Sequence, residues 1–202
     1  MNVNPTDKVL HLSFDDVAFA RADVFAGQFN KREVSNKLYK PLSADNAVLP
    51  FKDKEFDMVY SSNVLAYVAS PEKVFTEIRR ICKRAYIKER SVFAEMIFGW
   101  PQTRWLIDIE NSEFVIKAKN PMLVGRFGPL FHGFYQNDPS FFEACKQNIG
   151  LLNVAVDWFD SDSEIDGKIS LRPCSAEYVD ESRFVLGKIS DKIDVRHMIQ
   201  NK

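Results

Sequence analysis

Apolar and polar positions alternate in blocks along the chain, and the clearest blocks lie in its middle. Residues 56–62 form a short β-rich run bounded by polar turns, which predicts a central strand. After Ser70 and Pro71, which suit the start of a helix, apolar residues recur at helical spacing up to Cys82. Residues 85–87 then form another apolar run. This order of strand, helix and strand is typical of a parallel α/β sheet.

Shorter apolar runs before this block predict further strands. Residues 9–12 and 22–25 resemble buried strands, but only about ten residues separate them, fewer than an ordinary crossover helix needs. Residues 42–44 predict the end of a third strand. The polar and basic residues 28–39 predict a surface loop.

The second half of the chain has a different character. Residues 104–109 and 113–118 alternate in polarity around a polar turn, which predicts an inserted β-hairpin. Glycines and prolines predict a long loop over residues 121–133, and Pro139 predicts the start of a short helix. Residues 151–159 predict a last strand.

Length and composition limit the organisation and the class of protein. A chain of 202 residues with 46% hydrophobic content supports one sizeable core, which we assign to residues 1–159, with a C-terminal extension over residues 160–202. The 27 basic and 28 acidic residues are mixed, which argues against binding to nucleic acid or anionic lipid. Three scattered cysteines predict no metal site. Without a signal pattern or a membrane-spanning run, we expect a cytoplasmic protein.

The residues around the predicted central strand carry a resemblance to a known family. The pattern comprises an acidic loop with Leu-Pro-Phe, a Phe-Asp strand and a helix that starts at proline: residues 44–51, 56–65 and 71–81. In these segments the chain resembles the type 11 class I S-adenosylmethionine (SAM) methyltransferases. The stretch from Phe98 to Pro101, followed by Arg104 and Trp105, resembles a bacterial subgroup associated with surface-glycan loci. The resemblance covers residues 8–159 and implies an α/β fold with a Rossmann-like, mostly parallel sheet.

The resemblance also implies where SAM would bind. The family places glycines after the first strand, an acid for the ribose after the second and an acid near adenine after the third. The corresponding cofactor-binding positions are Ser13, Asp15, Gly27, Asp45, Asn46 and Ser61. Ser13 and Asp15 replace the two glycines, and Gly27 stands where the ribose carboxylate is expected. Of the acidic groups, only Asp45 is kept, so we expect SAM binding to be lost or weakened.

Groups that could act as a general base are also few. The Glu-His pair that the family carries after the fourth strand is replaced by Ala66 and Tyr67. His11, on a predicted buried strand, is more typical of a core histidine, which leaves His132 as the candidate catalytic base.

Three functions stay open on this basis. The sequence favours a methyltransferase-like pseudoenzyme that serves as a scaffold or regulatory partner without needing a cofactor. The second is an active methyltransferase that uses SAM to modify a small molecule or a glycan. The third is a module that binds another small ligand in the pocket where the resemblance places SAM. Aromatic residues between 98 and 135 predict either a cap on the sheet or a surface for a protein partner or second copy.

Overall fold

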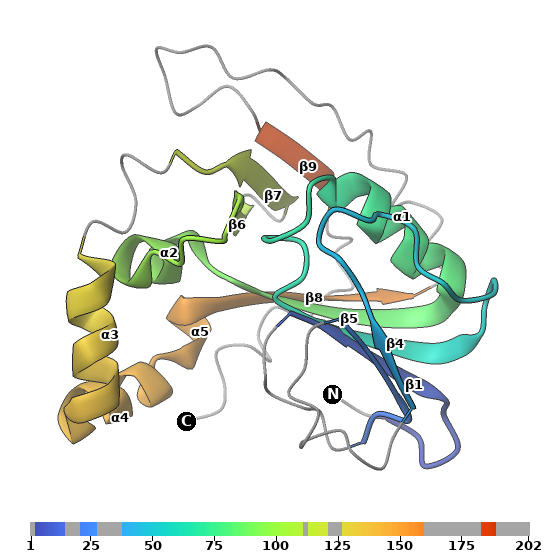
Figure 1. Cartoon of the computed structure of the whole chain (residues 1–202), viewed down its shortest axis with the longest axis horizontal. Coiled ribbons are helices and arrows are strands. Elements are labelled where there is room, and N and C mark those ends of the chain that lie inside the picture. Colours follow the sequence, from blue (N-terminus) through green and yellow to red (C-terminus); the bar gives the residue numbers. More distant parts are fainter. Residues whose placement is uncertain are drawn as a thin grey trace. The chain divides into compact units, whose positions relative to one another are not determined.

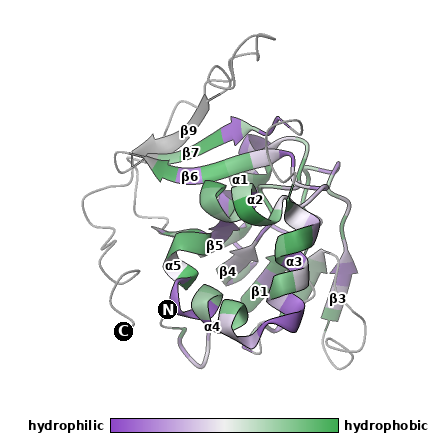
Figure 2. Cartoon of the chain, turned by 90° about the vertical axis from the view of Figure 1, so that its left-hand side faces the viewer, coloured by the Kyte–Doolittle hydropathy of each residue, from purple (hydrophilic) through white to green (hydrophobic). Residues whose placement is uncertain are grey.

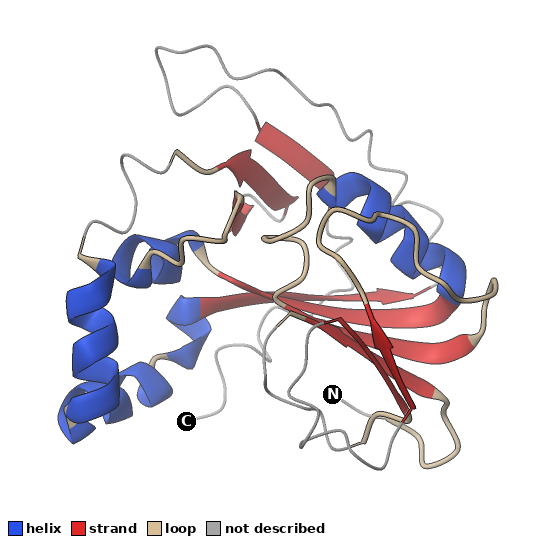
Figure 3. Cartoon of the chain, in the orientation of Figure 1, coloured by secondary structure: helices blue, strands red, loops and turns tan. Residues whose placement is uncertain are grey.

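The computed structural model describes residues 3–14, 21–27, 38–110, 113–120, 127–159 and 183–188. They divide into two compact units, Met1–Glu89 with Ala155–Ser163, and Arg90–Val154 with Glu164–Lys202. Figures 1 and 3 show the helices and strands of both units. In chain order the elements are β1 (Val9–Ser13), β2 (Val24–Gly27), β3 (Leu38–Pro41), β4 (Phe56–Ser62), α1 (Pro71–Ile81), β5 (Cys82–Arg90), α2 (Val92–Phe98), β6 (Trp105–Glu110), β7 (Glu113–Ala118), α3 (Gly128–Asn137), α4 (Pro139–Gln147), α5 (Ile149–Leu152), β8 (Asn153–Phe159) and β9 (Arg183–Lys188).

The first unit is built on a sheet with the strand order β3-β2-β1-β4-β5-β8. The pairs β1 with β2, β2 with β3, β1 with β4 and β4 with β5 are all parallel. The order 3-2-1-4-5 with parallel pairing is that of a Rossmann-like sheet, in which ligands bind beyond the carboxyl ends of the strands. The predicted fold class is therefore confirmed.

The central elements agree with the sequence pattern. All five residues of β1 are buried, as expected for a parallel strand covered on both faces. The predicted central strand corresponds to β4, and the predicted helix over residues 70–82 corresponds to α1, which begins at Pro71. Ser70 occupies the N-cap position, but its side chain makes no capping hydrogen bond.

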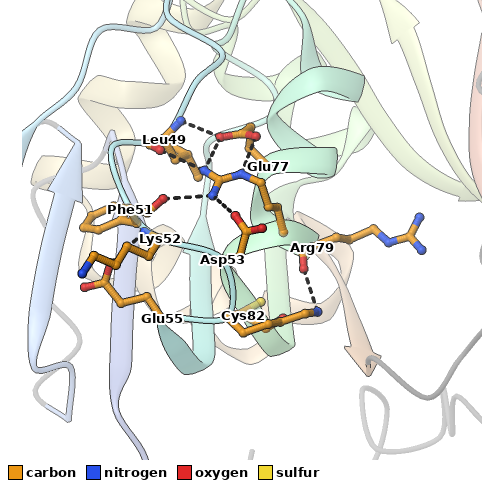
Figure 4. A network of polar contacts seen from close by, with 10 residues as sticks. Leu49, Phe51, Lys52, Asp53, Glu55, Glu77, Arg79 and Cys82 are labelled. Atoms are coloured by element: carbon orange, nitrogen blue, oxygen red, sulfur yellow. Dashed lines mark hydrogen bonds and ion pairs between the residues drawn. The ribbon is translucent and has the colours of Figure 1, made fainter.

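A polar network fixes the loop between β3 and β4 to α1 (Figure 4). Arg80 donates hydrogen bonds of 2.8 and 2.7 Å to the two carboxylate oxygens of Glu77. Its guanidinium also reaches the carbonyl oxygens of Leu49 and Phe51, at 3.1 and 2.9 Å, and the carboxylate of Asp53 at 2.7 Å. Glu77 in turn accepts a hydrogen bond from the backbone N–H of Leu49. The hydrogen bonds from Arg80 hold the pKa of the Glu77 carboxyl below its usual range.

The second unit contains an antiparallel sheet and four short helices. The predicted hairpin is confirmed as β6 and β7, and β9 extends it on the β7 side. A buried ion pair joins α2 to the end of β7, because Lys119 donates to the Glu95 carboxylate and to the Trp100 carbonyl oxygen. Both side chains are at most 4% exposed.

Four sequence predictions are wrong in position. The third strand, predicted to end at residues 42–44, is β3 and already ends at Pro41. The loop predicted over residues 121–133 contains the start of α3, because Gly128 and Pro129 form the first turn of a helix instead of interrupting one. The surface loop predicted over residues 28–39 ends inside β3, which begins at Leu38. The strand predicted from residue 151 begins at Asn153, after α5.

Two other predictions fall partly outside the described residues. Residues 160–182 and 189–202 are not among them, so the domain boundary between residues 159 and 160 stays a prediction. In the part of the chain that the structure describes, no helix is long and apolar enough to cross a membrane.

Candidate functional site

The carboxyl ends of β1 and β2 meet where the resemblance places the cofactor. Ser13 and Gly27 are the last residues of these strands and lie opposite each other in the parallel pairing. Both are buried, and Gly27 has a φ of 128°, a backbone conformation that is almost exclusive to glycine. A Cβ atom on Gly27 would lie 1.7 Å from the Ser13 carbonyl oxygen. Position 27 therefore cannot carry the ribose-binding carboxylate without a shift of the strand ends.

The other predicted cofactor positions are spread around this edge of the sheet. Asp45 and Asn46 lie in the exposed turn after β3, and the Asn46 side chain accepts a 3.0 Å hydrogen bond from the Val48 N–H. This contact makes Asn46 a turn former in the structure. Ser61 is fully buried on β4, beside Leu12 of β1. Asp15 lies outside the described residues.

A small apolar depression lies beside the carboxyl end of β1. Its walls come from β1, the loop after β3, the turn after β4 and α1, and are formed by Leu12, Phe14, Leu42, Ser43, Asn46, Leu49, Val64, Val68 and Val74. None of these side chains is charged. The depression has room for about one water molecule, whereas pockets for drug-sized ligands measure roughly 300–1,000 Å³. The depression formed by these described residues is therefore smaller than a SAM molecule.

Phe14 is one of the residues that line the depression. It follows β1 at the position between the two expected glycines, and its ring is half-buried. The ring meets that of Tyr67 edge to face, with centroids 6.3 Å apart. Tyr67 stands where the family carries a histidine, so two of the altered positions contact each other. The sequence marked Tyr67 as an altered position, but it could not show that the ring of Tyr67 contacts that of Phe14.

Glu89 is a buried acidic residue near the candidate site that the sequence analysis did not identify. It lies near the end of β5 and is fully buried. Its carboxylate accepts hydrogen bonds from the backbone N–H groups of Val64, Leu65 and Ala66, at 3.0, 2.9 and 3.4 Å. These hydrogen bonds satisfy the buried carboxylate and fix the turn after β4. The carboxylate is thus engaged in holding the backbone, and nothing in the sequence signals a partner more than twenty residues away.

The candidate base His132 lies on α3, in the second unit, and not in a loop. Its ring packs against Phe98 and Trp100, with centroid distances of 5.3 and 5.5 Å. The Arg90 guanidinium covers the Trp100 ring at 4.0 Å. These contacts place His132 in an aromatic cluster, and its catalytic role stays a prediction. Among the described residues, no group of histidine, cysteine and acidic side chains could hold a metal ion.

Comparisons with known proteins give a family for the first part of the chain. Residues 10–85 match the type 11 family whose description is "Methyltransferase domain". No curated protein matches.

Three solved structures illustrate the similarity. The first is a complex of the Haloferax volcanii Trm112 methyltransferase activator with a putative methyltransferase, at 22% identity over 45% of this chain and 48% of that chain, with a TM-score of 0.34. The second is a putative methyltransferase from Bacillus halodurans, at 13% identity over 44% and 47%, with a TM-score of 0.37. The third is a SAM-dependent methyltransferase from Mesorhizobium loti, at 11% identity over 75% and 89%, with a TM-score of 0.42.

This chain spans about half the length of the first two structures. The family match covers most of β1, all of β2 to β4, α1 and the start of β5, and it includes every residue that lines the depression. Residues 10–85 are therefore similar to a methyltransferase domain of the type 11 family.

Proposed function

We propose that this chain is a methyltransferase-like protein in which SAM binding is lost or much weakened, and that it acts as a non-catalytic scaffold or regulatory partner. The observation that carries the proposal is the chemistry at the ends of β1 and β2. Phe14, between the two positions where the family carries glycines, lines the depression with a bulky ring, and Gly27 stands in place of the ribose carboxylate.

The energy lost at these positions is large compared with an ordinary cofactor affinity. A missing charge-assisted hydrogen bond weakens binding by about 1.5–3 kcal/mol. Moving the Phe14 ring away from Tyr67 gives up an aromatic contact of about 0.5–1.5 kcal/mol, in addition to exposing apolar surface. Because about 1.4 kcal/mol corresponds to a factor of ten, these terms together lower the affinity by roughly two to three orders of magnitude.

Among the described residues, few groups could replace the missing contacts. Glu89 is committed to three backbone N–H groups, and the Asn46 side chain to its own turn. Neither is free to take the ribose hydroxyls without losing an existing hydrogen bond. This favours the scaffold over an active enzyme with a rearranged cofactor loop.

Calorimetric titration of the purified full chain with SAM and S-adenosylhomocysteine tests the proposal. We expect a dissociation constant of about 100 μM or weaker for both. A submicromolar constant, or cofactor that co-purifies with the chain, would contradict the proposal and favour the active methyltransferase.

A variant of Phe14 tests the physical reason. Phe14→Ala removes the ring from the depression, so we expect its affinity for SAM to rise measurably above that of the parent chain. Phe93→Ala is the matched control, because it removes an exposed ring in the second unit. Restoring an acid at position 27 is not a usable test, because the Cβ atom alone would strike the Ser13 carbonyl oxygen.

A further inference from the structure

The helices of the second unit expose an unusual amount of apolar surface. Among the described residues, eleven large hydrophobic side chains are exposed, and nine of them lie on α2, α3, α4 and α5 or at their caps. Figure 2 faces these helices, and the hydrophobic colour covers much of α2, α3 and α5. The nine side chains are Phe93, Met96, Phe127, Leu130, Phe134, Tyr135, Phe142, Ile149 and Leu151. We call them the helical patch.

The centre of the patch is a regular stripe on α3. Phe127, Leu130 and Phe134 follow one another at intervals of three and four residues, so they share one face of the helix. They are 70%, 53% and 42% exposed. Such a stripe on a helix predicts a buried contact with another element.

The stripe is backed by a packed aromatic layer. Phe141 of α4 lies 6.0 Å from the rings of both Phe131 and Phe134. A Cβ atom on Gly128 would lie 2.2 Å from the Phe98 carbonyl oxygen, so the start of α3 is pressed against the end of α2. The patch is therefore held in place before any partner binds, which lowers the entropic cost of association.

The area of the patch suits a stable protein interface. Taking about 200 Å² for each fully exposed large side chain, the exposed fractions sum to roughly 900 Å². The largest apolar patch on a typical monomer is about 300–600 Å². A standard interface buries about 800 Å² on each partner.

The charge of these helices selects the partner. α3 carries no charged side chain, and on α4 the Glu143 carboxylate pairs with Lys146 at 3.3 Å. A surface without net charge can meet an identical surface without repulsion, while a strongly charged partner would find no counter-charges. A helix that lies on a bilayer needs several basic residues on its polar face, and Lys146 is the only one in α2 to α5.

We infer that the helical patch is the contact surface between two copies of this chain, with the α3 stripes at the centre of a two-fold interface. This inference builds on the proposed scaffold function and assigns its first partner. It also moves the predicted interface: Phe98 is buried, and Trp100 and Phe131 are half-buried in the aromatic cluster, so the outward side chains of the helices provide the contact. The arrangement is isologous, as in most soluble dimers.

Sedimentation velocity and light scattering on the full chain, between about 1 and 100 μM, test this surface. We expect a dimer for the parent chain and monomers for Leu130→Glu and Phe134→Glu, since each places like charges at the two-fold contact. Val48→Glu is the matched control: Val48 is 65% exposed but lies in the first unit, so this variant should stay dimeric. Circular dichroism verifies that every variant is folded.

A charge-swap experiment separates a second copy from any other occupant. Phe134→Glu and Phe134→Lys should each be monomeric alone and should form a mixed dimer when combined at equal concentration. A monomeric parent chain at 100 μM would overturn the inference, as would dimerisation that survives both substitutions. Flotation with anionic phosphatidylserine vesicles is a further test. The inference would be overturned if the parent chain floated with the vesicles as a monomer and the Phe134→Glu variant did not. The SAM titration is independent: tight SAM binding by a dimer refutes the proposed function alone, and a monomer without SAM binding refutes this surface alone.

Discussion

The contact between Ser13 and Gly27 yields the sharpest test of the structure. In a Gly27→Ala variant the new methyl group would lie 1.7 Å from the Ser13 carbonyl oxygen, where ordinary contact begins at about 3.4 Å. The φ of 128° adds conformational strain of about 1–3 kcal/mol for any side chain. The strand ends must therefore separate.

Separation of the strand ends has a definite cost. The Gly27 carbonyl oxygen accepts hydrogen bonds from the Tyr39 hydroxyl at 2.8 Å and from the Leu42 N–H at 3.2 Å. Losing these contacts costs about 1 kcal/mol each. Added to the strain, the expected loss in the free energy of unfolding is about 3–5 kcal/mol, a large share of the 5–15 kcal/mol typical of a domain.

Urea unfolding followed by circular dichroism measures this loss. Gly133→Ala is the matched control, because a Cβ atom there meets nothing within 4 Å and the residue lies inside α3. That variant should be more stable than the parent by about 0.5–1 kcal/mol. If Gly27→Ala unfolded at the same urea concentration as the parent, the proposed obstruction of the ribose position would be wrong.

Three further predictions concern polar side chains that are buried or half-buried. Arg80→Lys should lower the free energy of unfolding by about 2–3 kcal/mol in urea titrations, because lysine cannot hold Glu77 with two hydrogen bonds and reach two carbonyl oxygens as well. Burial lowers the pKa of His11 from 6.5 to about 3. The unfolded chain therefore binds the proton more readily, and stability should be full above pH 6.5 and fall by about 2 kcal/mol by pH 5. Unfolding curves of His11→Leu should lack this decline, and an equal decline would contradict the assignment. Lys119→Met should lower the free energy of unfolding by about 3–5 kcal/mol, and adding Glu95→Leu should recover most of this loss. Thermal unfolding of the single and double variants measures both effects. A double variant no more stable than the single one would show that the ion pair is not the cause.

The central part of the fold could be predicted because local pattern and tertiary burial agree there. Apolar runs marked β1 and β4, and helical spacing after Pro71 marked α1. The start of α3 could not, because Gly128 and Pro129 read as loop residues unless the close approach of α2 is known. The position of β3 could not be predicted for a different reason. This strand lies at the edge of the sheet, and its side chains are half-buried or exposed, so it has no apolar run.

The site could be predicted only in outline. The resemblance located the ends of β1 and β2, and the structure adds what a linear pattern cannot contain. The φ of Gly27 and the contact between Phe14 and Tyr67 are properties of neighbouring strands and turns. The role of Glu89 depends on three N–H groups that a turn of the backbone brings together, and no side-chain pattern records their direction.

The Arg80 network bears on which positions of the chain can change. Arg80 recognises the loop after β3 mainly through backbone carbonyl oxygens, which every amino acid supplies, so the loop side chains themselves are weakly constrained by it. Positions 77 and 80 of α1, in contrast, depend on each other, because the two hydrogen bonds between them need both side chains. Mutational tolerance should therefore be high along the exposed loop and low at these two helix positions. The residues that line the depression can then change while the Arg80 network keeps the loop fixed to α1.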